Sequence, residues 1–153
     1  MPIDIGLSSF KIDGVKNEII KKVECNVQPY DIVTGSENKI LVANSGSNTI
    51  SIVCANGSVK TLKMPNNGHI DVDFNMTRVY VSNISSVAVY NIEKGNLLWR
   101  VDGFYSVKFI KLSNSKNKLF VLDDNKVTIY NAKDGSVIGT IVVGNAPSFI
   151  EIN

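Results

Sequence analysis

Short segments of alternating apolar and polar residues recur along the chain at a nearly constant interval. Four such runs begin at residues 3, 40, 79 and 119, so their starts are 37, 39 and 40 residues apart. Alternation with a period of two predicts β-strands, and the segments between the runs lack helical periodicity. We therefore predict an all-β chain built from four repeats, which occupy residues 3–39, 40–78, 79–118 and 119–153.

Each repeat carries four expected strands in the same order. A first run is followed by a second, then by a turn rich in Gly, Asn and charged residues, and then by two more runs. Four strands with a period near 40 residues are typical of a β-propeller blade, and blades bury one another's faces when they stack around an axis. The expected strands are 3–7, 10–12, 19–24 and 30–34; 40–44, 50–52, 59–63 and 70–73; 79–83, 87–89, 97–101 and 107–112; and 119–123, 127–129, 137–143 and 149–152.

Two stretches resemble a known family of propeller repeats. Residues 79–83 read Val-Tyr-Val-Ser-Asn, and residues 138–150 read Ile-Gly-Thr-Ile-Val-Val-Gly-Asn-Ala-Pro-Ser-Phe-Ile. They resemble the YVTN-type repeat, which occurs in surface-layer proteins, in lactonase-like proteins and in proteins of no known role; WD40 and quinoprotein repeats are more distantly similar. The resemblance implies an architecture rather than an activity. A Gly-x-x-x-Trp segment at 95–99 is similar to quinoprotein propellers but occurs once, so no cofactor is expected.

The resemblance also implies how the ring closes. In this family the strand after the Pro turn lies innermost, so 148–152 is expected to complete the first blade by pairing with 3–7. This gives one domain of four four-stranded antiparallel blades. The alternatives are two chains that form one eight-bladed ring, and half of a longer protein. One outer strand edge carries no charge, which makes it the expected contact with another chain in a homodimer: Thr140, Ile141, Val142 and Val143.

Composition and charge exclude several classes of partner. The 153 residues suit one domain, and the formal net charge of +2 gives no strong field for nucleic acid. No apolar run approaches 18 residues, so we expect no membrane span. Residues 1–9 lack a basic start followed by an apolar stretch, which favours a cytoplasmic protein or an already trimmed extracellular domain. Cys25 and Cys54 are expected to be reduced thiols, with a single bridge as the alternative.

Charged residues recur on the innermost strands, where they would line the central channel. The candidates are His69, Asp71, Asp73, Lys111 and Glu151, and Val33 occupies the equivalent position in another repeat. Buried charges of both signs are expected to pair with one another. Alternatively, Asp71, Asp73 and Glu151 could supply oxygen ligands to a cation or polar ligand.

The remaining candidates concern function. His69 could act as a general base oriented by Asp71 or Asp73, but no nucleophile motif accompanies it. Phe104 and Tyr105 precede an innermost strand and could form a binding patch on one ring face, or pack over the channel mouth. We expect a non-catalytic propeller that binds a macromolecule or itself through a ring face or channel rim. The alternative is a small-molecule or metal-ion propeller, including a lactonase-like hydrolase.

Overall fold

The chain folds into strands that are joined almost entirely by antiparallel hairpins. The computed structural model describes residues 8–13, 15–16, 18–65 and 68–152. The first sheet contains β3 (Pro29–Thr34), β4 (Ile40–Asn44), β5 (Thr49–Val53) and β6 (Val59–Lys63), with a 3-10 helix at Ser36–Asn38. The second contains β7 (Ile70–Val72), β8 (Arg78–Ser82), β9 (Ser86–Asn91) and β10 (Leu97–Asp102). The third contains β11 (Val107–Ser113), β12 (Lys118–Asp123), β13 (Lys126–Asn131) and β14 (Val137–Val142).

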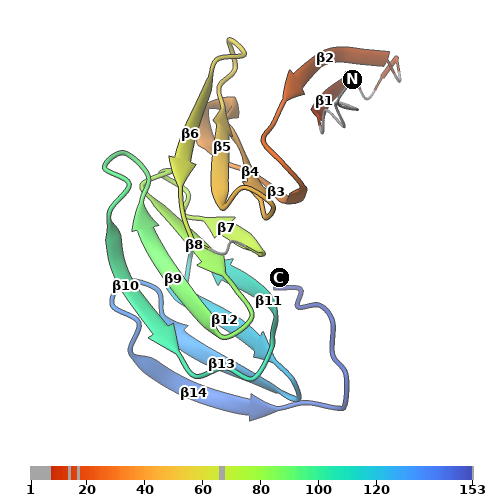
Figure 1. Ribbon diagram of the computed structural model, residues 1–153. Helices are drawn as coiled ribbons and strands as arrows, with labels where there is room; N and C mark the ends of the chain where they lie inside the picture. Colours follow the sequence, from red (N-terminus) through yellow and green to blue (C-terminus); the bar gives the residue numbers. More distant parts are fainter. Residues whose placement is uncertain (1–7, 14, 17, 66–67, 153) are drawn as a thin grey trace.

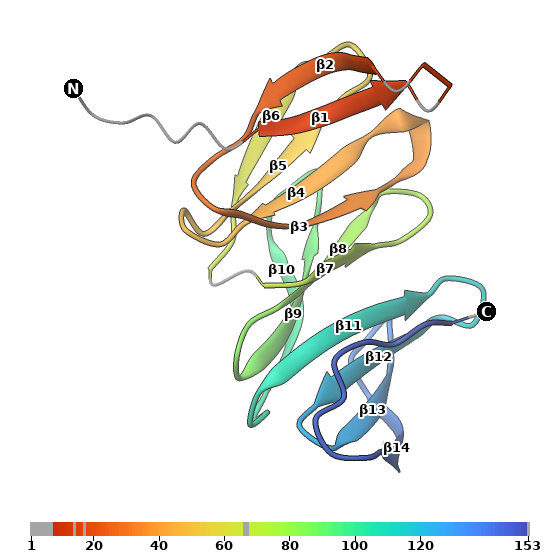
Figure 2. The ribbon, with the colours of Figure 1, turned by 90° about the vertical axis from the view of Figure 1, so that its right-hand side faces the viewer.

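A separate hairpin precedes the first sheet. It consists of β1 (Ser8–Asp13) and β2 (Glu18–Glu24), which pair with each other and form a two-stranded sheet. Figures 1 and 2 place this hairpin beside the first sheet, at the end of the molecule away from the third sheet. Cys25 and Cys54 are thiols that follow β2 and β5.

The three full sheets stack in chain order and form an open arc (Figure 1). In each sheet the first strand, β3, β7 or β11, lies on the inner side of the arc, and β7 lies between the other two. Within the described part of the chain, no helix has the length and apolar character needed to cross a membrane.

The apolar core lies between successive sheets rather than within one of them. One cluster joins the first and second sheets, and a second cluster joins the second and third sheets. The second sheet therefore buries both of its faces, because alternate side chains of a strand point to opposite faces. Fully or nearly fully buried members of these clusters include Leu41, Ile50, Val79, Tyr80, Val89, Leu119 and Val121.

Turn glycines fix the ends of the outer hairpins. Gly57, Gly95 and Gly135 have φ values of +85°, +70° and +77°, in the left-handed region that a side chain disfavours. Each occupies the turn before the last strand of its sheet, as the Gly-containing turns in the sequence predict.

The predicted blade count and ring closure are not confirmed. The described residues form three four-stranded sheets and one hairpin instead of four complete blades, and no strand spans 148–152. The expected partner strand, 3–7, lies outside the described residues. Residues 148–152 instead run beside β11 on the inner side of the arc (Figure 2).

Candidate functional site

Asp31 of β3 fixes the junction between the first two sheets. Its Oδ1 accepts a hydrogen bond from the Ile32 N–H at 2.9 Å, and its Oδ2 accepts one from the Ile70 N–H at 2.9 Å. Because Ile70 begins β7, this carboxylate ties together the inner strands of neighbouring sheets. Two backbone donors leave the Asp31 side chain little freedom to reorient.

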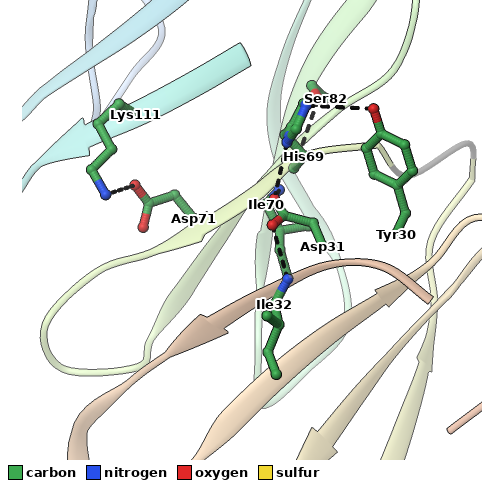
Figure 3. Close-up of polar contacts among 8 residues, drawn as sticks. All are labelled: Tyr30, Asp31, Ile32, His69, Ile70, Asp71, Ser82 and Lys111. Atoms are coloured by element: carbon green, nitrogen blue, oxygen red, sulfur yellow. Dashed lines mark hydrogen bonds and ion pairs between the residues drawn. The ribbon is translucent and has the colours of Figure 1, made fainter. Parts of the chain in front are cut away.

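Asp31 also orients His69, the residue before β7 (Figure 3). His69 Nδ1 lies 3.2 Å from Asp31 Oδ2, and Nε2 lies 3.5 Å from the Tyr30 hydroxyl oxygen. An ionised carboxylate only accepts hydrogen bonds, so Nδ1 carries the proton in this contact. In the neutral ring, Nε2 is then left as an acceptor directed toward Tyr30. The expected orienting partners, Asp71 and Asp73, do not perform this role.

Asp71 repeats the same device between the second and third sheets. Its Oδ1 accepts the Val72 N–H at 2.9 Å and its Oδ2 accepts the Leu112 N–H at 2.8 Å. Lys111 Nζ lies 3.9 Å from the same Oδ2, so the structure brings these two candidates together as an ion pair. Burial raises the pKa of the Asp71 carboxyl, and its hydrogen bond from Leu112 and the charge of Lys111 oppose that rise only in part.

Residues at one repeat position form a row of contacts along the inner side of the arc. Asp31 contacts His69, the His69 ring lies 4.8 Å from the Phe109 ring, and Phe109 lies 5.0 Å from Phe149, between ring centroids. These residues are 38, 40 and 40 positions apart. The sequence therefore contained a signal for Asp31: it stands one repeat before His69, two residues before the aligned position at Val33.

A cavity of about 710 Å³ opens over the end of the first two sheets where β3 and β7 begin. His69 and Ser82 lie within it, and exposed Tyr30 and Ile84 stand at its rim. The Arg100 guanidinium is held 2.7 Å from the Asp102 carboxylate, and that hydrogen bond lowers the pKa of Asp102. The cavity thus combines an apolar rim with a polar floor. Its lining comprises Tyr30, Ser45, Asn48, Gly68, His69, Ser82, Asn83, Ile84, Ser85, Arg100 and Val107.

Asp73 and Glu151 lie away from this cavity. Asp73 Oδ1 accepts the Thr77 and Arg78 N–H groups at 2.7 and 2.9 Å, so it holds the turn between β7 and β8, at the opposite end of the sheet from His69. Glu151 is exposed in the C-terminal segment. Among the described residues, no group of three or more His, Cys, Asp or Glu is arranged to hold a metal ion.

The expected aromatic patch is divided between core and surface. Phe104 is 8% exposed and packs against Tyr130, with ring centroids 6.2 Å apart, so it belongs to the core and not to a binding surface. Tyr105 is 83% exposed, and its N–H donates to buried Asp123. The uncharged edge lies on and just after β14: Thr140, Ile141 and Val142 are exposed, and Val143 is half-buried.

Known proteins resemble this chain in structure but not in sequence. No protein-family model matches the chain, and no curated protein sequence matches it. Hydrazine synthase from Kuenenia stuttgartiensis superimposes with a TM-score of 0.77 at 16% identity, covering 89% of this chain and 43% of its own. Its neighbourhood of structures consists of propellers. The chain has a β-propeller fold.

Two further propeller structures agree with this fold. A functionally unknown protein from Desulfotomaculum acetoxidans matches with a TM-score of 0.68 at 17% identity, covering 93% of this chain and 52% of its own. Kluyveromyces lactis Hsv2 matches with a TM-score of 0.64 at 15% identity, covering 78% of this chain and 38% of its own. This β-propeller chain therefore spans about half the length of the structures it matches, or less.

Proposed function

We propose that this chain is a non-catalytic binding module of the YVTN type, which holds an extended protein segment in the cavity beside His69. The resemblance of residues 79–83 to the YVTN repeat supports the family, and these residues include most of β8. The observation that carries the binding role is the exposed Tyr30 and Ile84 at the rim of a polar cavity of about 710 Å³.

The chemistry of this cavity suits a peptide better than a compact ligand. Tyrosine provides apolar area with one hydroxyl, and such residues supply much of the affinity in protein interfaces. The floor offers Ser, Asn and backbone groups from several loops, which can bond to the amides of an extended chain. Compact ligands usually occupy pockets that enclose most of their surface, whereas exposed side chains border this one.

A random-peptide selection on the intact protein tests the proposal. A selected peptide should bind Tyr30→Ala about 10- to 30-fold more weakly, because loss of one anchor costs about 2 kcal/mol. Binding is measured by fluorescence polarisation with the labelled peptide. The matched control is Phe74→Ala, since Phe74 is 75% exposed in the turn between β7 and β8, at the other end of the sheet.

Equal affinity for wild type and Tyr30→Ala, or weaker binding only in Phe74→Ala, would overturn the peptide site. Failure to enrich any peptide would do the same.

The Asp31 contact with His69 favours a second candidate, a hydrolase that acts on a small ester or lactone. A carboxylate that holds the Nδ1 proton leaves Nε2 able to accept a proton from water. Hydrolysis of a chromogenic ester by the purified protein should then fall about 100-fold or more in His69→Gln, because general base catalysis contributes about 100- to 10,000-fold. A rate that is the same in His69→Gln and wild type would reject this candidate.

A further inference from the structure

One repeat position is buried in two sheets and exposed in the third. Ile70 and Ile110 are 3% and 2% exposed, and each packs against the sheet that precedes its own. Ile32 holds the same register in β3, because Val33 pairs with Leu41 as Asp71 pairs with Tyr80. Yet Ile32 is 54% exposed. The place beside β3 where the inner strand of a preceding blade would stand is therefore open.

The far end of the arc exposes the opposite face of the repeat. Leu62 in β6 is 9% exposed and packs toward the second sheet. Ile141 in β14 occupies the same register, because Leu62 pairs with Ile50 as Ile141 pairs with Val127, but Ile141 is 53% exposed. The third sheet thus ends in a face that is equivalent to the one the first sheet buries against the second.

The C-terminal segment continues the inner strands past β11. Phe149 packs on Phe109 exactly one repeat further along the row that begins at Asp31. Within the described part of the chain, residues 148–152 belong to no sheet, and 149–152 hold the place of an inner strand without outer strands. Conversely, β1 and β2 form two outer strands without an inner one.

We propose that a second copy of this chain joins these incomplete halves. Residues 148–152 of one copy lie beside the β1–β2 hairpin of the other, where they cover Ile32, and the hairpin covers Ile141 of the first copy. The hairpin and the C-terminal segment lie apart in both views of the molecule (Figures 1 and 2). Two copies, each contributing three sheets and half of two shared blades, then form one closed ring of eight blades.

Three observations favour a second copy as the occupant. The two exposed faces are complementary by repetition, since the same pair of faces already meets twice within the chain. Both copies offer one donor end and one acceptor end, so the contact is head-to-tail and closes when the rotation is completed. The propellers that the chain matches are about twice its length or longer, which is the length that two copies supply. This inference does not depend on the proposed peptide site.

Light scattering after size exclusion, over a range of protein concentrations, tests the ring. The wild type should have twice the chain mass of 16.7 kDa. Ile32→Asp and Ile141→Asp should each shift the protein to the monomer, because each places a charge in an apolar contact. Leu97→Asp is the matched control, since Leu97 is 49% exposed in β10 of the middle sheet and should leave the dimer unchanged. Circular dichroism confirms that each variant retains its strands.

Mixing the two monomeric variants distinguishes this contact from any other dimer. The intact donor end of Ile32→Asp meets the intact acceptor end of Ile141→Asp, so the mixture should recover twice the chain mass through one undamaged contact. A wild type that is monomeric at every concentration, or forms larger assemblies, overturns the two-copy ring. A dimer that survives both single substitutions, or a mixture that stays monomeric, overturns it as well.

Discussion

Asp71 makes the stability of the fold depend on pH. Its carboxyl has a raised pKa because it is buried, so the folded chain holds this proton more tightly than the unfolded chain does. The free energy of unfolding therefore falls as the pH rises from the ordinary value, near 3.8, through the raised one. Urea titrations between about pH 3 and pH 7 should show this decline in the wild type relative to Asp71→Asn. A difference that stays constant or increases with pH would contradict it.

Two turn glycines separate backbone strain from packing. Gly95 and Gly135 have φ values of +70° and +77°, but a Cβ on Gly135 would stand 2.8 Å from a ring carbon of Trp99, whereas one on Gly95 would meet nothing within 4 Å. We expect Gly95→Ala to cost about 1 kcal/mol from the left-handed backbone alone. Gly135→Ala should cost about 1 to 3 kcal/mol more. Thermal or urea unfolding measures both, and equal losses would show that Trp99 moves aside freely.

Sequence reasoning identified the inner-strand charges but assigned the wrong partner to His69. The spacing placed Asp71 and Lys111 in neighbouring repeats, and they do meet, at 3.9 Å. Asp31 was missed because charges were compared only at the register of Val33, whereas Asp31 lies two residues earlier. A strand position must be aligned on both of its faces before contacts between sheets can be predicted, because a two-residue step keeps the side chain on the same face.

At the scale of the strands, stability depends on the layers between sheets. Leu119 of β12 is fully buried in the cluster that joins the second and third sheets. Leu119→Ala should lower the free energy of unfolding by about 2 to 5 kcal/mol, through lost apolar contact and the cavity left behind. Leu97→Ala, at an exposed position of β10, should change it by about 0.5 kcal/mol or less. Similar losses in the two variants would mean that the third sheet does not unfold with the second.

The strands of the three full sheets were predictable to within one or two residues at each end, whereas 149–152 was not. Alternation and Gly-containing turns specify a strand locally, and β4 and β6 coincide with their predicted ranges. A strand also needs a neighbour to accept its backbone hydrogen bonds. Residues 148–152 lie beside β11, the inner strand of another sheet, and have no described outer strand next to them, so the same alternating pattern gives no strand there.

For the whole molecule, the sequence determined the repeat but not the closure of the ring. Each local contact between sheets is encoded in residues such as Ile70 and Ile110, which both neighbours bury. The number of blades depends instead on the small rotation between successive sheets, summed around the axis. No single residue encodes that rotation, which is why four blades in one chain and eight blades in two chains were equally compatible with the spacing.

The stacking order predicts a gradient of protection along the chain. The second sheet buries both faces, so amide hydrogens of β8 and β9 should exchange most slowly. The hairpin of β1 and β2 should exchange fastest at low protein concentration, because an isolated pair of strands is only marginally stable. Hydrogen exchange followed by mass spectrometry measures the gradient. Since a second copy would add an inner strand beside this hairpin, its protection should rise with protein concentration while that of β8 stays constant. Uniform protection along the chain, independent of concentration, would mean that the sheets open as one unit.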